Sequence, residues 1–302
     1  TGFWFNGGGP ASAYVGVRAD GTVHLIEGSA DIGGSRAACA MIVAEVLGLA
    51  AEDVDPQVAD TDGIGYTSVT GGSSVIQKTG KASHEAALRV KEEMIRRAAK
   101  IWELEADQII YHTDTGTMTS EAKPDETLTF AQVAQQANRT GGPIAGEATS
   151  DGSGAGAAFA THIVDVEVDI ETGKVDVIRF TVAQDVGTAI HPSYVEGQLE
   201  GGAVQGIGWA LSEEYFYDEK GRLASASYLD YRVPTPLDVP MIEAILVEVP
   251  NPHHPYGVRG VGETPIIPPV AAIGNAIGAA TGKRMYHTPM NPPYVLEKVL
   301  GS

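Results

Sequence analysis

One acidic side chain, Glu263, lies among glycines and prolines in the stretch PYGVRGVGETPIIPP, residues 255–269. Gly257, Gly260 and Gly262 allow the backbone to approach a bound group closely, and the proline-rich run that follows fixes the path into a predicted helix. A carboxylate held rigidly beside such backbone could serve as a general base. The alternative is that Glu263 only interacts with the dipole of the following helix, which would contribute about 0.3 to 1 kcal/mol.

A second candidate site lies in GSADIGGSRAACAMIVAEVLG, residues 28–48, where a predicted strand leads through Gly33, Gly34 and Ser35 into a predicted helix. Unpaired backbone N–H groups and the positive end of the helix dipole favour a phosphate or pyrophosphate at such a junction. Arg36 could bind the same anion through its guanidinium group. The alternative is a plain tight turn in which Ser35 caps the helix.

Two further segments combine glycine with hydrogen-bonding side chains. TSVTGGSSVIQKTG, residues 67–80, clusters hydroxyls and glycines and could form another anion-binding nest. In residues 185–214, glycines inside a predicted helix each cost up to about 1 kcal/mol relative to alanine, so we expect something to press close to that helix. Gln198 and Gln205 in this segment could hydrogen-bond a polar ring edge or be ordinary buried glutamines. The helix glycines are Gly201, Gly202, Gly206 and Gly208.

The elements that must position these residues follow the same order twice. Alternating apolar residues predict a hairpin at 13–28 and another at 161–186. Apolar residues three and four positions apart predict helices after each hairpin. The predicted helices are 36–48, 82–104, 202–214 and a segment from Pro268 to Thr281.

This order predicts an α+β fold of two related lobes, each a mixed β-sheet packed with helices. No fixed-period sequence repeat is visible. The strongest Gly/Ser/Ala-rich interruption, residues 141–157, suggests a boundary between a first lobe at 1–145 and a second lobe at 146–302.

Composition excludes several classes of function. The 302 residues include 39 acidic and 20 basic side chains, a formal charge of −19, which disfavours nucleic acid and anionic membranes as partners. The single cysteine, Cys39, permits no internal disulfide and cannot hold an iron–sulfur cluster, and its apolar surroundings predict a small core residue. No histidine pair has metal-ligand spacing. Without a visible transmembrane or secretion segment, a cytoplasmic protein is expected.

Three extended motifs, taken in order, identify a family resemblance. They are DVGTAIHPSYVEGQLEGGAVQGIGWALSEE, YLDYRVPTPLDVP and PYGVRGVGETPIIPPVAAIGNAIGAATGKR. Together they resemble the molybdopterin-binding portion of the xanthine dehydrogenase and aldehyde oxidase family of molybdenum hydroxylases. The resemblance covers nearly the whole chain and is strongest after residue 160.

The resemblance implies roles for the residues singled out above. The family's active-site base, the glutamate of a Gly-x-Gly-Glu motif, corresponds to Glu263, which would deprotonate a molybdenum-bound hydroxyl. The implied cofactor, molybdenum–molybdopterin in its cytosine dinucleotide form, would be held on the glycine-rich turns. No protein ligand to the metal is implied, because the pterin sulfurs hold it. The corresponding cofactor-binding positions are Gly33, Gly34, Ser35, Arg36, Gly72, Ser73, Ser74, Gln198, Gln205, Val261 and Gly262.

The sequence departs from the family pattern in two respects. Ile32-Gly33-Gly34 stands where the family commonly has Gly-Gln-Gly, so a contact from that glutamine side chain is absent. The chain also begins after the family's other molybdopterin-binding domain, so we expect either a natural split subunit or a fragment. The resemblance implies a second molybdopterin-binding chain and partner chains that carry iron–sulfur clusters and FAD.

These inferences predict a subunit of a hydroxylase or dehydrogenase that oxidises an aldehyde or an N-heteroaromatic small molecule, with water as the oxygen source. One alternative is a structural subunit that binds cofactor without catalysis, against which the retained Glu263 argues. Another is a relative that acts on carbon monoxide or an aromatic thioester.

Overall fold

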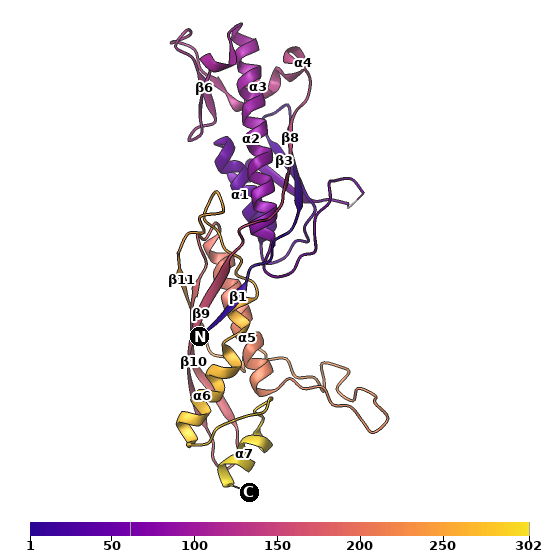
Figure 1. Cartoon of the computed structure of the whole chain (residues 1–302), viewed down its shortest axis with the longest axis vertical. Coiled ribbons are helices and arrows are strands. Elements are labelled where there is room, and N and C mark those ends of the chain that lie inside the picture. Colours follow the sequence, from indigo (N-terminus) through magenta and orange to yellow (C-terminus); the bar gives the residue numbers. More distant parts are fainter. Residues whose placement is uncertain (61, 302) are drawn as a thin grey trace. The chain divides into compact units, whose positions relative to one another are not determined.

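The computed structural model describes residues 1–60 and 62–301, and its contacts divide the chain into two compact lobes (Figure 1). The first lobe comprises Asn6–Gly156 and Pro250–Gly260. The second comprises Thr1–Phe5, Ala157–Val249 and Val261–Ser302. Each lobe therefore contains a short segment that is distant in sequence from the rest of it.

A four-stranded sheet forms the first lobe, in the order β4-β3-β2-β8. The hairpin β2–β3 and the pair β2–β8 are antiparallel, whereas β3 and β4 are parallel. Because parallel neighbours need a crossover, helix α1 connects β3 to β4. The bounds are β2 (Ala11–Val17), β3 (Val23–Glu27), α1 (Ser35–Leu47), β4 (Val54–Val58) and β8 (Ile144–Ser150).

Helices α1 and α2 (Val75–Trp102) cover this sheet and enclose one hydrophobic core, in which Leu25, Cys39 and Met94 are fully buried. The burial of Cys39 confirms its prediction as a small core residue. Smaller elements complete the lobe: η1 (Ala51–Asp53), η2 (Ala106–Gln108), β5 (Ile110–His112), β6 (Thr117–Thr119), β7 (Leu128–Thr129), α3 (Phe130–Gln135) and α4 (Ala137–Thr140).

The second lobe has a sheet in the order β1-β9-β10-β11. Again the central hairpin β9–β10 and one edge pair, β1–β9, are antiparallel, and β10–β11 are parallel with a helix, α5, between them. A core centred on Phe180, Leu199 and Ile273 joins the sheet to α5 and α6. The bounds are β1 (Gly2–Phe5), β9 (Ala157–Val168), β10 (Val175–Asp185), α5 (Pro192–Leu211), β11 (Ile242–Val247), η3 (Thr264–Ile266), α6 (Pro269–Thr281) and α7 (Pro292–Leu300).

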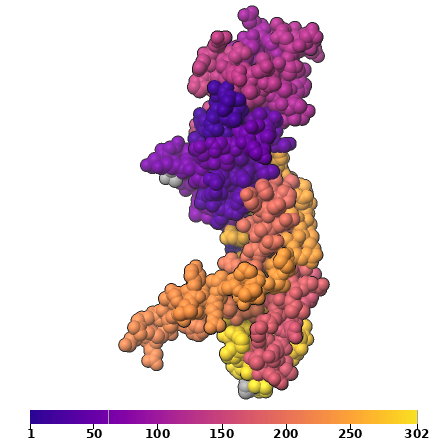
Figure 2. All heavy atoms as spheres, turned by 180° about the vertical axis from the view of Figure 1, so that it is seen from behind, coloured from indigo at the N-terminus to yellow at the C-terminus, as the bar shows by residue number. Residues whose placement is uncertain are grey.

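Both lobes thus share one strand arrangement, in which a hairpin, a crossover helix, a parallel strand and a second helix follow in chain order. The antiparallel edge strand differs in connectivity, because β8 follows the second helix of the first lobe and β1 precedes the hairpin of the second. This arrangement confirms the predicted α+β fold of mixed sheets packed with helices. The second lobe also carries one long segment, residues 212–241, which extends away from its helices and sheet and appears in orange in Figure 2. Tyr228, Leu237 and Met241 on this segment are almost fully exposed.

Helix starts and the lobe boundary differ from the predictions. Helix α2 begins at Val75, ahead of the predicted 82. The prediction missed its first turns because Gln77, Lys78 and Thr79 are polar although buried, so the apolar helical pattern is absent there. Helix α5 begins at Pro192, ahead of the predicted 202. The predicted boundary at 145/146 falls inside β8, and the chain enters the second lobe at Ala157.

The described residues contain no helix that is both long enough and apolar enough to span a membrane. The structure confirms both predicted hairpins, at 13–28 and 161–186. It also confirms the ends of α6, which has Pro269 at its first position and Gly282 as its C-cap. These features are local, so the sequence pattern was sufficient to predict them.

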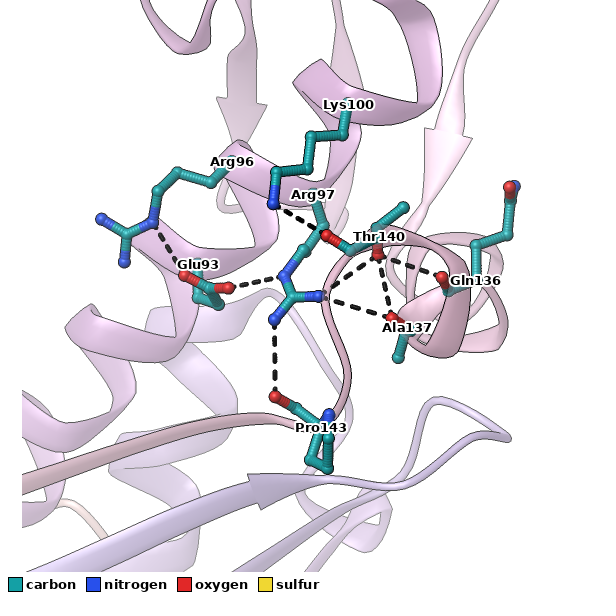
Figure 3. Close-up of polar contacts among 8 residues, drawn as sticks. All are labelled: Glu93, Arg96, Arg97, Lys100, Gln136, Ala137, Thr140 and Pro143. Atoms are coloured by element: carbon teal, nitrogen blue, oxygen red, sulfur yellow. Dashed lines mark hydrogen bonds and ion pairs between the residues drawn. The ribbon is translucent and has the colours of Figure 1, made fainter.

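A buried guanidinium fastens α2 to the turn that precedes β8 (Figure 3). Arg97 is only 5% exposed, pairs with Glu93 on the same helix at 2.5 Å, and donates weaker bonds to the carbonyl oxygens of Ala137 and Pro143 at 3.4 and 3.5 Å. It also donates to the Thr140 hydroxyl at 3.4 Å. Arg97 therefore joins α2 to α4 and to the turn at Pro143, all within the first lobe.

We expect Arg97→Met to lower the free energy of unfolding of the chain by about 2 to 3 kcal/mol, because a buried charge pair loses one partner and several carbonyls lose a donor. Arg96 is the matched control, since it bonds the same Glu93 from an exposed position at 2.7 Å. Arg96→Met should change stability by less than about 0.5 kcal/mol. Urea unfolding followed by circular dichroism measures both, and equal losses would contradict this assignment.

Candidate functional site

Glu263 is the N-cap of η3, lies six residues before Pro269, the first residue of α6, and is partly buried. Its carboxylate Oε2 accepts a hydrogen bond of 3.1 Å from the indole Nε1 of Trp4, a residue of β1. Trp4 was not predicted as a site residue, because nothing in the local sequence links residue 4 to residue 263. The pairing of β1 with β9 brings it into the second lobe.

The turn that carries Glu263 is packed tightly against α5. A Cβ atom on Gly202 would lie 2.5 Å from Cγ of Pro265, and one on Gly206 would lie 2.3 Å from Cβ of Pro269. The expectation that something presses close to this helix is therefore confirmed at these two positions. The prolines after the carboxylate fill the space that the missing side chains leave, which fixes η3 on the helix.

The predicted amides on α5 are seven residues apart, close to two helical turns. Gln198 is half-buried, whereas Gln205 is exposed and lines a hollow of about 360 Å³ together with Ile266 of η3. Aromatic rings and carboxylates form the rest of its wall, and Tyr231 donates a 2.6 Å hydrogen bond to Glu213. The remaining lining residues are Trp209, Glu213, Glu214, Tyr215 and Tyr231.

In the first lobe, the glycine-rich turn before α1 has a left-handed backbone at two successive residues, and the N–H of Ser35 donates to the carbonyl oxygen of Ile32 at 3.1 Å. Gly33 and Gly34 have φ of +59° and +76°, and Gly34, not Ser35, is the N-cap. The alternative in which Ser35 caps the helix is therefore wrong, and its hydroxyl is buried without a partner among the described residues. Arg36 is exposed and forms an ion pair of 3.0 Å with Asp31.

The turn before α2 has a similar form. Gly72 has a φ of +66°, and Ser73, although it carries a side chain, has a φ of +53°. Ser74 is the N-cap of this 28-residue helix, and its hydroxyl is buried without a hydrogen-bond partner in the described part of the chain. The two turns therefore combine helix N-termini, left-handed backbone and buried hydroxyls, which together suit an anion.

One prediction about the glycines before Glu263 needs correction. A Cβ atom on Gly260 would lie 2.0 Å from the carbonyl oxygen of Ser73, so the close approach at Gly260 comes from the protein itself and not from a bound group. Val261 accepts a long hydrogen bond, 3.5 Å, from Nε2 of the fully buried Gln184. Gly262 is exposed beside it.

The predicted site residues thus form two sets. Gln198, Gln205 and the segment Val261–Glu263 lie in the second lobe, and the two glycine-rich turns before α1 and α2 lie in the first. In neither set, nor elsewhere among residues 1–60 and 62–301, do three or more His, Cys, Asp or Glu side chains gather in a way that could hold a metal ion.

Comparison with known proteins gives the family. The molybdopterin cofactor-binding domain family matches residues 1–240. The chain belongs to this family. The xanthine dehydrogenase molybdenum-binding subunit of Escherichia coli O157:H7 is 33% identical over 295 residues, which cover 95% of this chain and 39% of that protein. The carbon monoxide dehydrogenase large chain of Afipia carboxidovorans is 29% identical over 275 residues, covering 89% and 34%.

Solved structures of molybdenum hydroxylases agree with this family membership. Quinoline 2-oxidoreductase from Pseudomonas putida 86 is 30% identical, with a TM-score of 0.85 over 97% of this chain and 38% of that one. The predicted membership of the xanthine dehydrogenase and aldehyde oxidase family is confirmed. The chain spans about two fifths of the length of the curated relatives it matches.

The anion-binding features fit a phosphate-bearing molybdopterin. The backbone N–H groups at the starts of α1 and α2 could donate to phosphate oxygens, and the Ser74 hydroxyl could donate to the same group. Arg36 fits less well, because its guanidinium is already paired with Asp31.

The packing of α5 against η3 yields a paired test on neighbouring residues. Gly202→Ala should destabilise the chain by about 1 to 3 kcal/mol, because its methyl group would overlap the Pro265 ring and displace η3. Gly201→Ala should be neutral or stabilising by up to about 1 kcal/mol, because open space surrounds that position. Calorimetric melting temperatures compare the two, and a harmless Gly202→Ala would mean that η3 is not held by α5.

Another buried group lies at the base of the first glycine-rich turn. Glu27, the last residue of β3, is fully buried, and its Oε2 accepts a 2.6 Å hydrogen bond from the backbone N–H of Ser29. Its Oε1 has no partner among the described residues. Burial raises the pKa of Glu27 from its ordinary 4.5 to about 7, so the carboxyl favours its protonated form more than an exposed acid does.

This shift makes stability depend on pH. Because the folded pKa is above the unfolded one, the stabilising contribution of protonated Glu27 is complete below pH 4.5 and is lost as the pH rises through about 7. Between pH 5 and pH 8, wild type should therefore lose up to about 3 kcal/mol relative to Glu27→Gln. Urea titrations at each pH measure this difference, with exposed Glu147→Gln as control. Parallel pH profiles for wild type and Glu27→Gln would contradict the shift.

Proposed function

We propose that this chain forms the base-bearing, molybdopterin-binding part of a molybdenum hydroxylase that oxidises an aldehyde or an N-heteroaromatic compound with water as the oxygen source. The observation that carries the proposal is the fixed carboxylate of Glu263. It begins η3, its Oε2 is bonded by Trp4, and the prolines after it are locked into the glycine face of α5. Such restraint suits a group that must meet a proton in one geometry.

The chain's contribution to the reaction would be positioning and proton transfer. The bound cofactor supplies the two-electron oxidation chemistry. Glu263 would accept the proton of the attacking oxygen at its carboxylate, while the Trp4 indole keeps that carboxylate from rotating away. The hollow beside Gln205 and Ile266 would receive the organic substrate.

We propose the cytosine dinucleotide form of molybdenum–molybdopterin as the cofactor. Its pyrophosphate would lie at the turns of Gly33, Gly34 and Ser35 and of Gly72, Ser73 and Ser74, where the N–H groups that begin α1 and α2 and the helix dipoles favour negative charge. The N–H of Ser35 itself is already bonded to the Ile32 carbonyl oxygen. Gln198, Gln205, Val261 and Gly262 would contact the pterin from the second lobe. Arg36 would contribute only if it exchanged its Asp31 partner for the anion.

We also propose that partner polypeptides complete the enzyme: a second molybdopterin-binding chain, an iron–sulfur subunit and a flavin subunit. The relatives support this, since their names describe a molybdenum-binding subunit and a large chain. The cytoplasm is the proposed location.

Carbon monoxide is the second candidate substrate. The likeness to carbon monoxide dehydrogenase, with a TM-score of 0.89 and 25% identity over 99% of this chain, favours it. The aromatic hollow instead favours a planar organic substrate, because a space of about 360 Å³ lined by Trp209, Tyr215 and Tyr231 is suited to a ring and unnecessary for a diatomic gas.

The proposal predicts that Glu263→Gln lowers turnover at least about 10²-fold while the cofactor stays bound, because a neutral amide cannot accept the proton. The measurement is oxidation of quinoline and of benzaldehyde by the complex purified from its native host. Metal analysis and the cytidine monophosphate released by acid hydrolysis report bound cofactor. Glu297→Gln, exposed on α7, is the control.

Each outcome has a distinct meaning. Near-normal turnover by Glu263→Gln would remove Glu263 from the role of base. A wild-type complex without molybdenum or pterin would overturn catalysis and favour a structural subunit. Carbon monoxide oxidation in place of the organic substrates would favour the second candidate.

A further inference from the structure

Four consecutive residues, Trp4–Gly7, contact Glu263 within the second lobe and Gly260 and Gly72 within the first. We call this segment the N-terminal strap. In the second lobe, Trp4 donates to Glu263. In the first lobe, Asn6 bonds Gly260, and the backbone N–H of Gly7 donates to the carbonyl oxygen of Gly72.

The Asn6 side chain holds Gly260 at both of its backbone polar groups. Its Nδ2 donates to the Gly260 carbonyl at 3.0 Å, and its Oδ1 accepts from the Gly260 N–H at 3.1 Å. Asn6 is only 6% exposed, so these bonds are protected from water. A buried backbone needs partners for both groups, and one amide supplies both in a fixed plane.

Gly260 is also confined from the other side by the turn before α2. An added Cβ would lie 2.0 Å from the Ser73 carbonyl oxygen and 2.6 Å from the Ser73 Cβ. Ser73 has the left-handed φ of +53°, a conformation that a residue with a side chain adopts at a cost and that the surroundings must maintain. The clamp between Asn6 and Ser73 therefore leaves Gly260 little freedom.

Chain connectivity links this clamp to the base. Gly260 precedes Glu263 by three residues, so even a fully extended chain holds their Cα atoms within about 11 Å. Trp4 precedes Asn6 by two residues. The strap consequently restrains the short segment 260–263 at both of its ends, through Asn6 at Gly260 and through Trp4 at Glu263.

We infer that Asn6 and Trp4 are positioning residues for the base. Asn6 fixes the start of the base-bearing segment against the turn of the anion cradle, and Trp4 orients the carboxylate at its end. This inference deepens the proposed function and rests on it for its catalytic part. Its structural part, the restraint of residues 257–263 by the strap, is independent of any reaction.

Hydrogen–deuterium exchange of the purified complex tests the structural part. Asn6→Ala should raise exchange several-fold in peptides that contain residues 257–263 and 70–75, because both segments lose their common anchor. Asn6→Ser keeps a hydroxyl that can make only one of the two bonds, so it should have an intermediate effect and serves if Asn6→Ala folds poorly. The control is Asn291→Ala, which removes the N-cap of α7 and should raise exchange only near that helix.

Kinetics test the catalytic part. Trp4→Phe removes the indole donor but keeps an aromatic ring, and we expect kcat to fall about 10-fold or more with KM nearly unchanged, because a misplaced base affects the chemical step more than binding. Trp102→Phe is the matched control, since Trp102 also donates its indole N–H to a glutamate, Glu126, at 2.9 Å. It should leave kcat unchanged.

The results separate this inference from the proposed function. Unchanged exchange at 257–263 in both Asn6 variants would overturn the strap, whatever the enzyme does. Normal kcat in Trp4→Phe, with active wild type, would overturn its positioning role and leave the proposed function intact. A wild-type complex with no pterin and no activity would overturn the proposed function and the catalytic role, while the exchange result would still decide the restraint.

Discussion

The antiparallel pairing of β1 with β9 is the interaction on which the proposed site depends. It aligns Gly2 with Ala160 and Phe5 with Ala157, and so makes the first residues of the chain an edge strand of the second lobe. The next residue, Asn6, already belongs to the first lobe. Without this pairing the sheet would lose a strand, Trp4 would have no route to Glu263, and the buried amide of Asn6 would lose its fixed position.

Both lobes have the same chain order from the hairpin to the second helix, and the candidate residues lie in corresponding loops of this order. In each lobe the loop that follows the parallel edge strand leads into the second helix: β4 to α2 in the first and β11 to α6 in the second. The first loop ends in Gly72, Ser73 and Ser74, and the second contains Glu263. Loops at the carboxyl ends of parallel strands are free to carry function, because they are not needed for sheet pairing. One architecture therefore presents hydroxyls and N–H groups in one lobe and a carboxylate in the other.

Local patterns in the sequence predicted much of this fold. Alternation gave both hairpins, proline and glycine gave the ends of α6, and the glycines of α5 indicated a close neighbour. The family resemblance was confirmed as well. The start of α2 was missed because Lys78 is buried there, with its ammonium bonded to Ser68 and Val69. A hydropathy pattern treats lysine as a surface residue and therefore cannot predict its burial.

Long-range contacts were beyond the reach of the sequence. Nothing near Glu263 indicated that Trp4 would bond it, and nothing near Gly260 indicated that Ser73 would exclude a side chain there. The assignment of individual residues to the cofactor remains a prediction. Its strongest physical support is the combination of helix N-termini with the buried hydroxyl of Ser74, which has no hydrogen-bond partner among residues 1–60 and 62–301.

The interleaving of the two lobes along the chain also determines the order in which they can be completed during synthesis. The first lobe requires residues 250–260, and the contact of Trp4 with Glu263 joins positions 259 residues apart. Closing so long a loop early has a high entropic cost, and a nascent chain cannot close it before residue 263 has left the ribosome. The carboxylate proposed as the base can therefore reach its place only after the whole of residues 1–263 has been synthesised, and the second core is completed later still, because it needs Ile273 and Ile277 of α6.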